Sequence, residues 1–301
     1  MTTQTHDAGL PLLGCIEAGG TKFVLGVATG PDTVLRTARV ATTRPDETIG
    51  AALDFFRTAA ADFGAFAAFG IASFGPVDLD PRSSGWGRIG DTPKEGWRDA
   101  DIAGPFGQAF DCPVGFDTDV NGAILAEHLW GAARGTDVAV YVTVGTGIGG
   151  GALVAGRPVH GLRHPEMGHM LPRRHPDDRD FAGICPFHGD CLEGLASGPA
   201  IIARWGASLS ELPEGHVGRT IIADYLAQLV VAQHAILSPQ RIVFGGGVLA
   251  TPGLLDLVRA RAEVLAAGYF GDGGDGLIVA PGLGDRAGLL GALALAQRAR
   301  R

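Results

Sequence analysis

The sequence predicts an α/β fold made of two domains around a cleft. Its 301 residues are enough for two moderate domains, each with its own hydrophobic core. Apolar strands repeatedly end in glycine-rich turns, and a unit of strand, glycine turn and strand occurs at the start of the chain and again at 138–154. A repeated unit of this kind indicates two halves of similar architecture, with a substrate expected between them.

The first half opens with a predicted meander of three strands. A helix then begins at Pro45, which suits the first helical position, carries apolar residues at a spacing close to 3.6, and stops at Gly64. The stretch 75–104 is rich in Gly, Pro, Asp and Trp without periodicity, so we expect a functional loop there. The predicted strands are 12–18, 23–28, 33–40, 66–73 and 113–116, and a helix is expected through 121–130.

The second half repeats the opening pattern around an irregular segment, 160–193, that carries His and Cys residues. We place the domain boundary near Asp117. The predicted domains are therefore 1–117 and 118–285, and the closing helix 286–301 is expected to join the first domain. Further predicted elements are strands 138–144, 241–244 and 277–280, a strand ending through Val154, two helical stretches after Glu193, a helix through 255–265 and a last helix at 288–298.

Composition and charge exclude several classes of partner. The net charge of −8 disfavours binding to nucleic acid. No apolar run reaches the roughly 18 residues that cross a bilayer, and residues 1–9 lack the features of a signal peptide. We therefore expect a cytoplasmic protein without a membrane partner, in which disulfides are disfavoured. Cys15 and Cys112 are interpreted as buried free thiols.

Three glycine turns together predict a nucleotide site. Each follows a strand, where backbone N–H groups can approach phosphate oxygens. One such turn alone is more often a tight hairpin, and neither a Walker A loop nor a Rossmann fingerprint is present. The combination favours phosphate binding. The predicted ATP-binding residues are Gly19, Gly20, Thr21, Lys22, Gly145, Thr146, Gly147, Gly245, Gly246 and Gly247.

Candidate carboxylates lie where a predicted strand meets a predicted helix, at Phe116–Gly122. Phosphoryl transfer to an alcohol needs a base that orients and deprotonates the hydroxyl group, and Asp119 could serve. The alternative is that an Asp or Thr at this place caps the helix. Both interpretations stay open from these residues, and Asp117 is the better candidate for a structural role.

A second cluster predicts a structural zinc site. Cys185, His188 and Cys191 lie three apart in a loop containing Pro and Gly, and His169 upstream could complete a tetrahedral Cys₂His₂ set. The other histidines near this loop are alternative ligands, although each is interpreted as an ordinary surface histidine. These alternatives are His160, His164 and His175.

Zinc at this cluster would also help to position residues that bind the substrate. It would fold the segment and hold Glu166 and Glu193 in place. Carboxylates of this kind accept hydrogen bonds from neighbouring sugar hydroxyl groups.

These motifs resemble those of the ROK family of sugar kinases and sugar-responsive repressors, which has the actin-like ATPase (ribonuclease H-like) fold. The resemblance covers nearly the whole chain. It rests on the motifs EAGGTK at 17–22, DTDVN at 117–121, VGTGIGGG at 144–151, EMGH at 166–169 and CPFHGDCLEG at 185–194.

The resemblance implies a hexose kinase that uses ATP and Mg²⁺, with Asp119 as the catalytic base. It also implies a zinc site formed by His169, Cys185, His188 and Cys191. Thr118 stands where the family usually has an Asn before the base. The sugar-binding residues that the resemblance implies are Gly75, Pro76, Thr92, Lys94, Thr118, Asp119, Glu166, His169 and Glu193.

Some departures from the commoner glucokinase pattern resemble the fructokinase branch of the family. These are Glu17 at the start of the first turn, the Cys-Pro-Phe-His form of the zinc loop, and the segments 73–78 and 92–97. We therefore expect fructose as the substrate and fructose 6-phosphate as the product. A mannokinase or a broad hexokinase is the alternative, because one hydroxyl configuration changes only a few hydrogen bonds. A homodimer is expected.

Two other classes of function are disfavoured. A sugar-sensing repressor needs a helix-turn-helix before the first phosphate strand, and only about a dozen residues precede that strand. A sugar-binding protein without activity would have no need of a base candidate and both phosphate turns.

Overall fold

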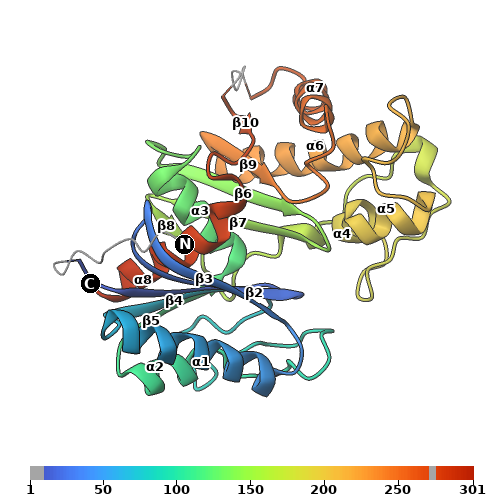
Figure 1. Cartoon of the computed structure of the whole chain (residues 1–301). Coiled ribbons are helices and arrows are strands. Elements are labelled where there is room, and N and C mark those ends of the chain that lie inside the picture. Colours follow the sequence, from blue (N-terminus) through green and yellow to red (C-terminus); the bar gives the residue numbers. More distant parts are fainter. Residues whose placement is uncertain (1–9, 271–275) are drawn as a thin grey trace. The chain divides into compact units, whose positions relative to one another are not determined.

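A computed structural model describes residues 10–270 and 276–301 of the chain, which form two compact units (Figure 1). Unit 1 contains the described residues up to Ala126 together with His160–His164 and Asp285–Arg301. Unit 2 contains Glu127–Val159 and Pro165–Gly284. The interpretation of residues 1–9 as lacking a signal peptide concerns residues outside the described part.

The sheet of unit 1 has five strands in the order β3-β2-β1-β4-β5. The first three strands form an antiparallel meander, whereas β4 and β5 run parallel to β1. Strands β1 and β4 lie inside the sheet and are buried on both faces, which explains why they are almost continuously apolar. The strands are β1 (Leu13–Ala18), β2 (Lys22–Gly30), β3 (Thr33–Ala41), β4 (Ala68–Ser73) and β5 (Val114–Thr118).

Helices cover both faces of this sheet, with α1 and α2 on one face and α8 on the other (Figure 1). Helix α8 lies so close to β4 that a Cβ atom on Gly70 would stand 1.8 Å from the carbonyl oxygen of Ala292. Glycine at this position therefore allows the close approach. The helices that belong wholly or partly to unit 1 are α1 (Pro45–Phe63), α2 (Gly104–Phe110), α3 (Asp119–Trp130) and α8 (Ala287–Ala299), and a 3₁₀ turn, η3 (Gly284–Arg286), precedes α8.

Aromatic side chains fill the core between α1, α2 and the sheet. Phe56 of α1 is fully buried and stands edge-on to Phe69 of β4, with ring centroids 4.8 Å apart. It also stands edge-on to Phe66 and Phe106, at 5.6 and 6.0 Å. Such tilted aromatic contacts add to the free energy of burying the rings and fix α1 and α2 on the sheet.

The sheet of unit 2 repeats the arrangement of unit 1, with the strand order β10-β9-β6-β7-β8. Strands β6, β7 and β8 form the antiparallel meander, and β9 and β10 run parallel to β6. The predicted repetition is therefore confirmed. The strands are β6 (Val138–Val144), β7 (Ile148–Val154), β8 (Arg157–Pro158), β9 (Arg241–Gly245) and β10 (Ile278–Val279).

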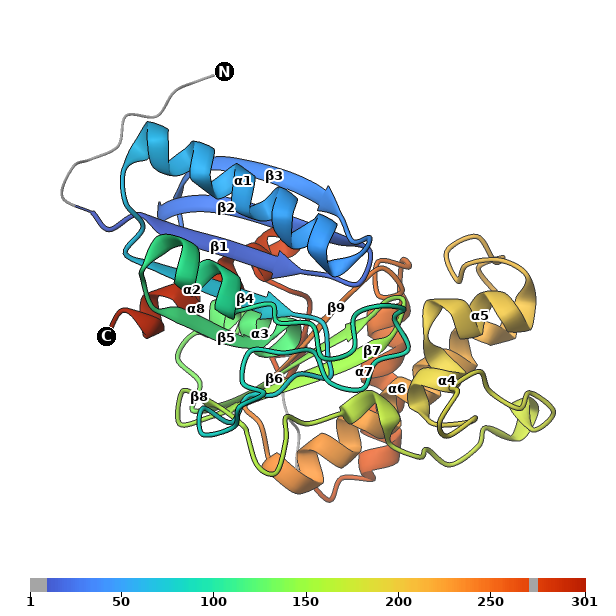
Figure 2. The ribbon, with the colours of Figure 1, turned by 90° about the horizontal axis from the view of Figure 1, so that it is seen from below.

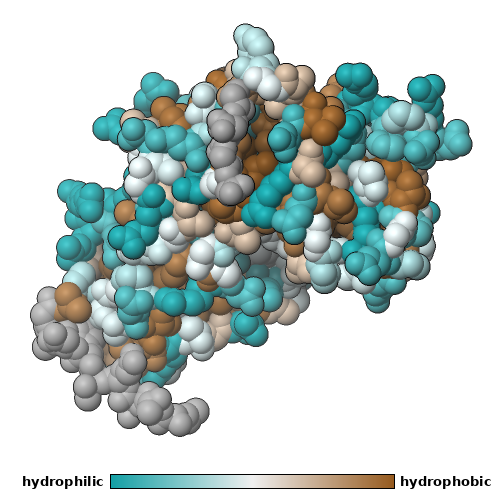
Figure 3. Space-filling model, turned by 90° about the horizontal axis from the view of Figure 1, so that it is seen from above, coloured by the Kyte–Doolittle hydropathy of each residue, from teal (hydrophilic) through white to brown (hydrophobic). Residues whose placement is uncertain are grey.

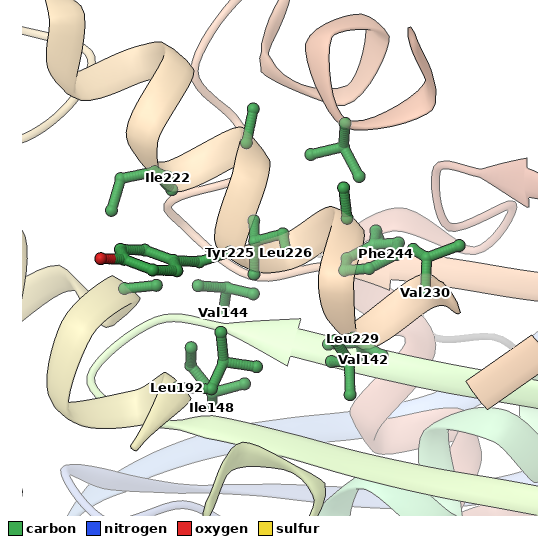
Figure 4. Close-up of a cluster of buried hydrophobic side chains, with 14 of the residues drawn as sticks. Val142, Val144, Ile148, Leu192, Ile222, Tyr225, Leu226, Leu229, Val230 and Phe244 are labelled. Carbon is green, nitrogen blue, oxygen red and sulfur yellow. The ribbon is translucent and has the colours of Figure 1, made fainter. Parts of the chain in front are cut away.

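Helix α6 packs on this sheet through an apolar cluster (Figure 4). Leu226 and Leu229 of α6 meet Val142 and Val144 of β6 and Phe244 of β9, all of which are buried. The remaining elements of unit 2 are α4 (Leu192–Ala196), α5 (Gly198–Trp205), α6 (Val217–Leu237) and α7 (Leu254–Ala266), with 3₁₀ turns η1 (Met167–His169) and η2 (Pro176–Asp178).

Helix α6 is long and apolar enough to cross a membrane by length and composition, and in the described part of the chain it alone meets that test. Because 56% of its most apolar window is buried inside unit 2, it is a core helix. The face drawn in Figure 3 mixes hydrophilic and hydrophobic residues and does not present a continuous apolar band.

Several local features differ from the sequence-based expectations. The short helix α2 was not anticipated, because Gly104, Pro105 and Gly107 give its seven residues little helical character. Helix α3 begins at Asp119, two residues earlier than expected. Cys15 is buried as predicted, but Cys112 is only partly buried, since it follows α2 in an exposed turn.

Candidate active site

Three parallel strands of unit 1 end at the same level of the sheet (Figure 2). Ala18 at the end of β1 pairs with Ser73 at the end of β4, and Ser73 pairs with Thr118 at the end of β5. The first glycine turn, the loop with Gly75 and the turn with Asp119 each follow one of these strands. The register therefore places three groups of predicted site residues at one carboxyl edge, where open α/β sheets bind ligands.

The first glycine turn is tight and open to solvent. The amide of Gly19 donates a hydrogen bond to the carbonyl oxygen of Lys22 at 3.0 Å, and the hydroxyl group of Thr42 donates to the carbonyl oxygen of Gly19 at 2.7 Å. Thr21 and Lys22 are exposed. These two hydrogen bonds thus fix the backbone of the turn, while Thr21 and Lys22 stay accessible to a phosphate group.

Glu17 lies just before this turn and is largely buried. Burial raises the pKa of its carboxyl group, and the nearby cations Lys22 and Arg39 oppose that shift only in part.

The sugar-side loop is anchored by a buried tryptophan. The indole N–H of Trp97 donates to the carbonyl oxygen of Thr43 at 2.8 Å, and its ring packs on Phe23 and Phe74 at centroid distances of 5.6 and 5.4 Å. Phe23 directly follows Lys22. The loop is therefore fixed next to the first glycine turn and to the end of β4.

Two pairs of predicted sugar ligands lie in this loop. The carbonyl oxygen of Pro76 accepts a hydrogen bond from the amide of Gly90 at 2.7 Å, and the hydroxyl group of Thr92 accepts one from the amide of Lys94 at 3.3 Å. Gly75, Pro76, Thr92 and Lys94 are all partly exposed. Hydrogen bonds thus hold the backbone of this loop while the four residues stay accessible to a ligand.

The cap of helix α3 is supplied by Thr118. Its hydroxyl oxygen accepts the amide N–H of Asn121 at 3.1 Å, which is the usual bond from an N-cap residue to the third helical residue. Asp119 is instead the first helical residue, is half-buried, and accepts the amide N–H of Val120 at 2.8 Å. The interpretation of Asp119 as the capping side chain therefore loses its main support, and its role as base stays a prediction.

Asp117 has the surroundings of a structural carboxylate. It is 3% exposed, and its Oδ1 accepts hydrogen bonds from the amide of Thr118 at 2.8 Å and from the side-chain amide of Asn121 at 2.7 Å. His160 Nε2 lies 3.0 Å from its Oδ2. The hydrogen bond to Asp117 raises the pKa of His160, and partial burial opposes this shift.

The alternative zinc ligands near this region have other partners. His160 contacts Asp117, and the buried Nε2 of His164 accepts the amide N–H of Val77 at 3.1 Å. His175 accepts the amide N–H of Asp177. The interpretation of His164 as an ordinary surface histidine was wrong, because it is buried and contacts a residue 87 positions away, which no local pattern indicates. His160 is exposed, as expected of a surface histidine, although it also pairs with Asp117.

The second and third glycine turns meet at the carboxyl edge of the sheet in unit 2. Thr143 of β6 pairs with Gly245 of β9, and the amide of Val248 donates to the carbonyl oxygen of Val144 at 3.0 Å. Gly246 has a φ of +93°, and a Cβ atom there would stand 2.4 Å from that same carbonyl oxygen. Only glycine fits such a close, left-handed turn.

Glu193 packs against the second turn. Its Oε2 accepts the amide N–H of Ile148 at 2.9 Å, and a Cβ atom on Gly147 would stand 2.6 Å from the same oxygen. The amide of Gly198, at the start of α5, donates to the carbonyl oxygen of Gly145 at 2.8 Å. A predicted sugar ligand and a predicted phosphate turn are thus joined by a hydrogen bond within unit 2.

The four predicted zinc ligands form one cluster. Ligand atoms of His169, Cys185, His188 and Cys191 all lie within 4.8 Å of one another. The Sγ atom of Cys185 is 3.7 Å from the Nδ1 atoms of His169 and His188, and the Sγ atom of Cys191 is 3.5 Å from Nδ1 of His169. A tetrahedral zinc ion with bonds of about 2.3 Å to sulfur and about 2.0 Å to nitrogen separates these atoms by about 3.5 Å. The donor set therefore fits zinc.

A buried ion pair fastens the segment between the zinc ligands to the helices of unit 2. Asp178 of η2 is 5% exposed and accepts the hydroxyl hydrogen of Tyr225 at 2.7 Å. It also lies 3.2 Å from the guanidinium group of Arg204, which stacks over the rings of Phe181 and Trp205. A folded protein tolerates buried charges when they are paired and hydrogen-bonded in this way.

Glu166 lies just before η1, and its carbonyl oxygen accepts the amide N–H of His169 at 3.0 Å. The residue is exposed overall, but partial desolvation of its carboxyl group raises the pKa, and Glu193 adds to that shift while His169 opposes it. The two predicted sugar carboxylates thus influence each other electrostatically.

Unit 2 also has a cavity of about 580 Å³ between the segment after His169 and helices α6 and α7. Arg173, Arg179 and Arg261 are among its lining residues, and none of the predicted site residues lines it. We therefore do not assign it to the sugar or the nucleotide.

Two sheets of the same strand order, with glycine turns at their carboxyl edges and a carboxylate beside one of them, define an actin-like fold built for phosphoryl transfer. The chain belongs to the ROK family, whose model matches residues 13–299.

Individual proteins agree with this assignment. The chain is 55% identical to a fructokinase of Zymomonas mobilis over 95% of its own length and 96% of the relative's. Its fold is similar to that of a ROK hexokinase from Thermus thermophilus, with a TM-score of 0.77, 27% identity and coverage of 95% and 98% of the two chains. It is also similar to a ROK glucokinase from Streptomyces griseus solved with glucose and AMPPNP, with a TM-score of 0.71, 25% identity and coverage of 95% and 99%.

Proposed function

We propose that the protein is an ATP-dependent fructokinase that makes fructose 6-phosphate. The observation that carries this proposal is its 55% identity, over nearly the full length of both chains, to a fructokinase. The position of Asp119 at the carboxyl edge of unit 1 supports it, because a kinase needs a carboxylate beside its phosphate turn.

In the proposed reaction, Asp119 orients the 6-hydroxyl group of the sugar and accepts its proton. The hydroxyl oxygen attacks the γ-phosphorus atom in line, the bond between that phosphorus and the bridging oxygen breaks, and ADP leaves with the electron pair. Because Thr118 caps α3, Asp119 is spared that role.

The proposed sugar ligands are those that the sequence analysis named. Gly75, Pro76, Thr92, Lys94 and Thr118 contribute from unit 1, and Glu166, His169 and Glu193 contribute from unit 2. The partly exposed carboxylates accept hydrogen bonds from hydroxyl groups, and Lys94 donates them.

The nucleotide phosphates are proposed to bind to the amides of the glycine turns that begin at Gly19, Gly145 and Gly245. Lys22 is exposed at the first turn and can pair with a phosphate group. Mg²⁺ bound with the nucleotide would offset the charge of the phosphate oxygens.

Zinc is proposed to have a structural role only. His169, Cys185, His188 and Cys191 would hold it, and four protein ligands leave no position open for substrate. A cytoplasmic location and a homodimeric state remain predictions from the sequence.

The test is ADP release measured over a panel of hexoses, with ATP and Mg²⁺ present. Fructose should give the highest kcat/KM, mannose should follow, and ribose and glycerol should be poor substrates. The alternative function, a mannokinase or a broad hexokinase, predicts mannose at or above fructose. A clear preference for glucose would contradict the proposal.

A further inference from the structure

A five-residue segment, His160–His164, belongs to unit 1 although the residues on both sides of it belong to unit 2. It follows the short strand β8, and the chain returns to unit 2 at Pro165, directly before Glu166. A histidine stands at each end of the segment, and each one binds a different part of unit 1.

The first histidine binds the turn that carries Asp119. His160 Nε2 lies 3.0 and 3.2 Å from the two carboxylate oxygens of Asp117, and 3.3 Å from the side-chain nitrogen of Asn121. Asp117 and Asn121 stand two residues before and two residues after Asp119. A donor at His160 therefore holds Asp117, and the Oδ1 atom of Asp117 also accepts the side-chain amide of Asn121 at 2.7 Å, so these contacts link the two ends of the five-residue stretch in which Asp119 is the central residue.

The second histidine binds the start of the sugar-side loop. His164 is 7% exposed, and its Nε2 accepts the amide N–H of Val77, itself a buried residue, at 3.1 Å. Val77 directly follows Pro76 and forms a bridge with Ile89. Without an acceptor at this place, a buried amide would lose its partner, so the loop would have to shift to find another.

We propose that His160 and His164 are positioning residues of the active site, the first for the turn with Asp119 and the second for the loop with Gly75 and Pro76. The inference rests on the proposed function, because those three residues are its base and two of its sugar ligands. It assigns different kinetic effects to the two histidines. Loss of the first impairs the chemical step, and loss of the second impairs sugar binding.

The test compares leucine and glutamine at each position. Leucine removes the polar atom at similar volume, whereas the amide of glutamine places an oxygen or nitrogen near the position of the ring Nε2. His164→Leu should raise the KM for the sugar about tenfold, the effect of losing one buried hydrogen bond, and leave the KM for ATP within about twofold. His164→Gln should restore most of the sugar affinity.

Substitution of His160 should instead change kcat and leave the KM for the sugar nearly unchanged. His160→Leu should lower kcat about tenfold with little change in the KM for the sugar, since the base is misplaced and the sugar ligands are not. His160→Gln, which can still donate to Asp117, should recover most of the turnover.

His216 provides a matched control. Its Nδ1 accepts the amide N–H of Gly218 at 3.0 Å, which is the same kind of bond as that of His164, but it caps helix α6 of unit 2. His216→Leu should lower the melting temperature and leave kcat and both KM values unchanged. If it reproduces the kinetic effects of the other two leucine variants, these effects come from lost stability and the inference is wrong.

The kinetic constants of the leucine variants decide whether the inference holds. Unchanged kinetic constants in folded His160→Leu and His164→Leu proteins would overturn the inference. If His164→Leu does not fold, His164→Asn replaces it, because its shorter amide stays polar without reaching the Nε2 position, and the rise in sugar KM is still expected. All variants are assayed with whichever hexose the unsubstituted protein prefers, so failure of the fructose assignment is seen separately.

Discussion

The two sheets of the molecule have the same strand order, yet they hold their site residues by different means. In unit 1 the predicted residues follow the ends of regular strands, and the register of β1, β4 and β5 sets their level. In unit 2 the glycine turns follow strands in the same way, but Glu166 and His169 lie on an irregular segment. One topology can thus place the predicted base through the ends of its sheet strands and the predicted sugar ligands through the irregular segment 160–193.

The irregular segment 160–193 needs its own source of stability. Few of its residues are in regular structure, so few backbone hydrogen bonds hold it. The cluster of the four predicted zinc ligands and the buried pair of Asp178 and Arg204 hold it in place of a sheet. Removing the metal should therefore damage unit 2 and spare unit 1.

The largest expected effect is that of Cys185→Ser. Its zinc content should fall from about one ion per chain to near zero, because the ion loses one of four ligands. The melting temperature of unit 2 should fall by at least about 5 °C, the shift that roughly 2 kcal/mol causes in a domain of this size. Elemental analysis and calorimetry measure the two quantities.

Cys15→Ser serves as the control for this prediction, since Cys15 is a buried thiol of unit 1 outside the zinc cluster. It should leave the zinc content unchanged. Hydrogen exchange sharpens the comparison: amides in 166–194 should exchange faster in Cys185→Ser, and those of β1 and β4 should not. Equal loss of protection in both units would refute a zinc site local to unit 2.

A smaller effect is expected from pH, and it concerns unit 1. The pKa of His160 is raised in the folded protein by its hydrogen bond to Asp117. The charged pair therefore stabilises the fold fully below the ordinary histidine pKa of about 6.5, and this stabilisation is lost as the pH rises through the folded value. Because the side chain of His160 is 40% exposed, solvent screens the pair and the effect should be modest.

Urea unfolding between pH 5.5 and 9 measures this effect. The free energy of unfolding of the unsubstituted protein minus that of His160→Gln should shrink as the pH rises. If this difference stays constant across the pH range, the charge of His160 does not contribute to the free energy of unfolding.

Much of the fold could be predicted from the sequence because its signals are local. Glycine turns after apolar strands marked the ends of β1, β6 and β9, and Pro45 and Gly64 marked the ends of α1. The cluster of His and Cys side chains that could hold zinc could be predicted because three of its four members stand within seven residues. Each of these patterns depends on residues that are neighbours along the chain.

The rest depended on contacts between distant residues. The sequence left the roles of Asp117, Thr118 and Asp119 open, since all three residues suit a helix start. The structure distinguishes their contacts: Thr118 makes the cap bond, and Asp117 binds a histidine 43 positions away. No local pattern indicates such a pairing, so the contact of His160 was not anticipated and buried His164 was misinterpreted as a surface residue.

The central claim is that the sheet of unit 1 presents Asp119 as the base and keeps Asp117 for structure. Asp119→Asn should lower kcat by about 10²-fold or more with KM and melting temperature nearly unchanged, because it removes the proton acceptor and keeps the shape. Asp117→Asn should affect stability at least as much as turnover, since it removes a buried charge that pairs with His160. If Asp117→Asn abolishes turnover while Asp119→Asn retains it, the base has been assigned to the wrong carboxylate.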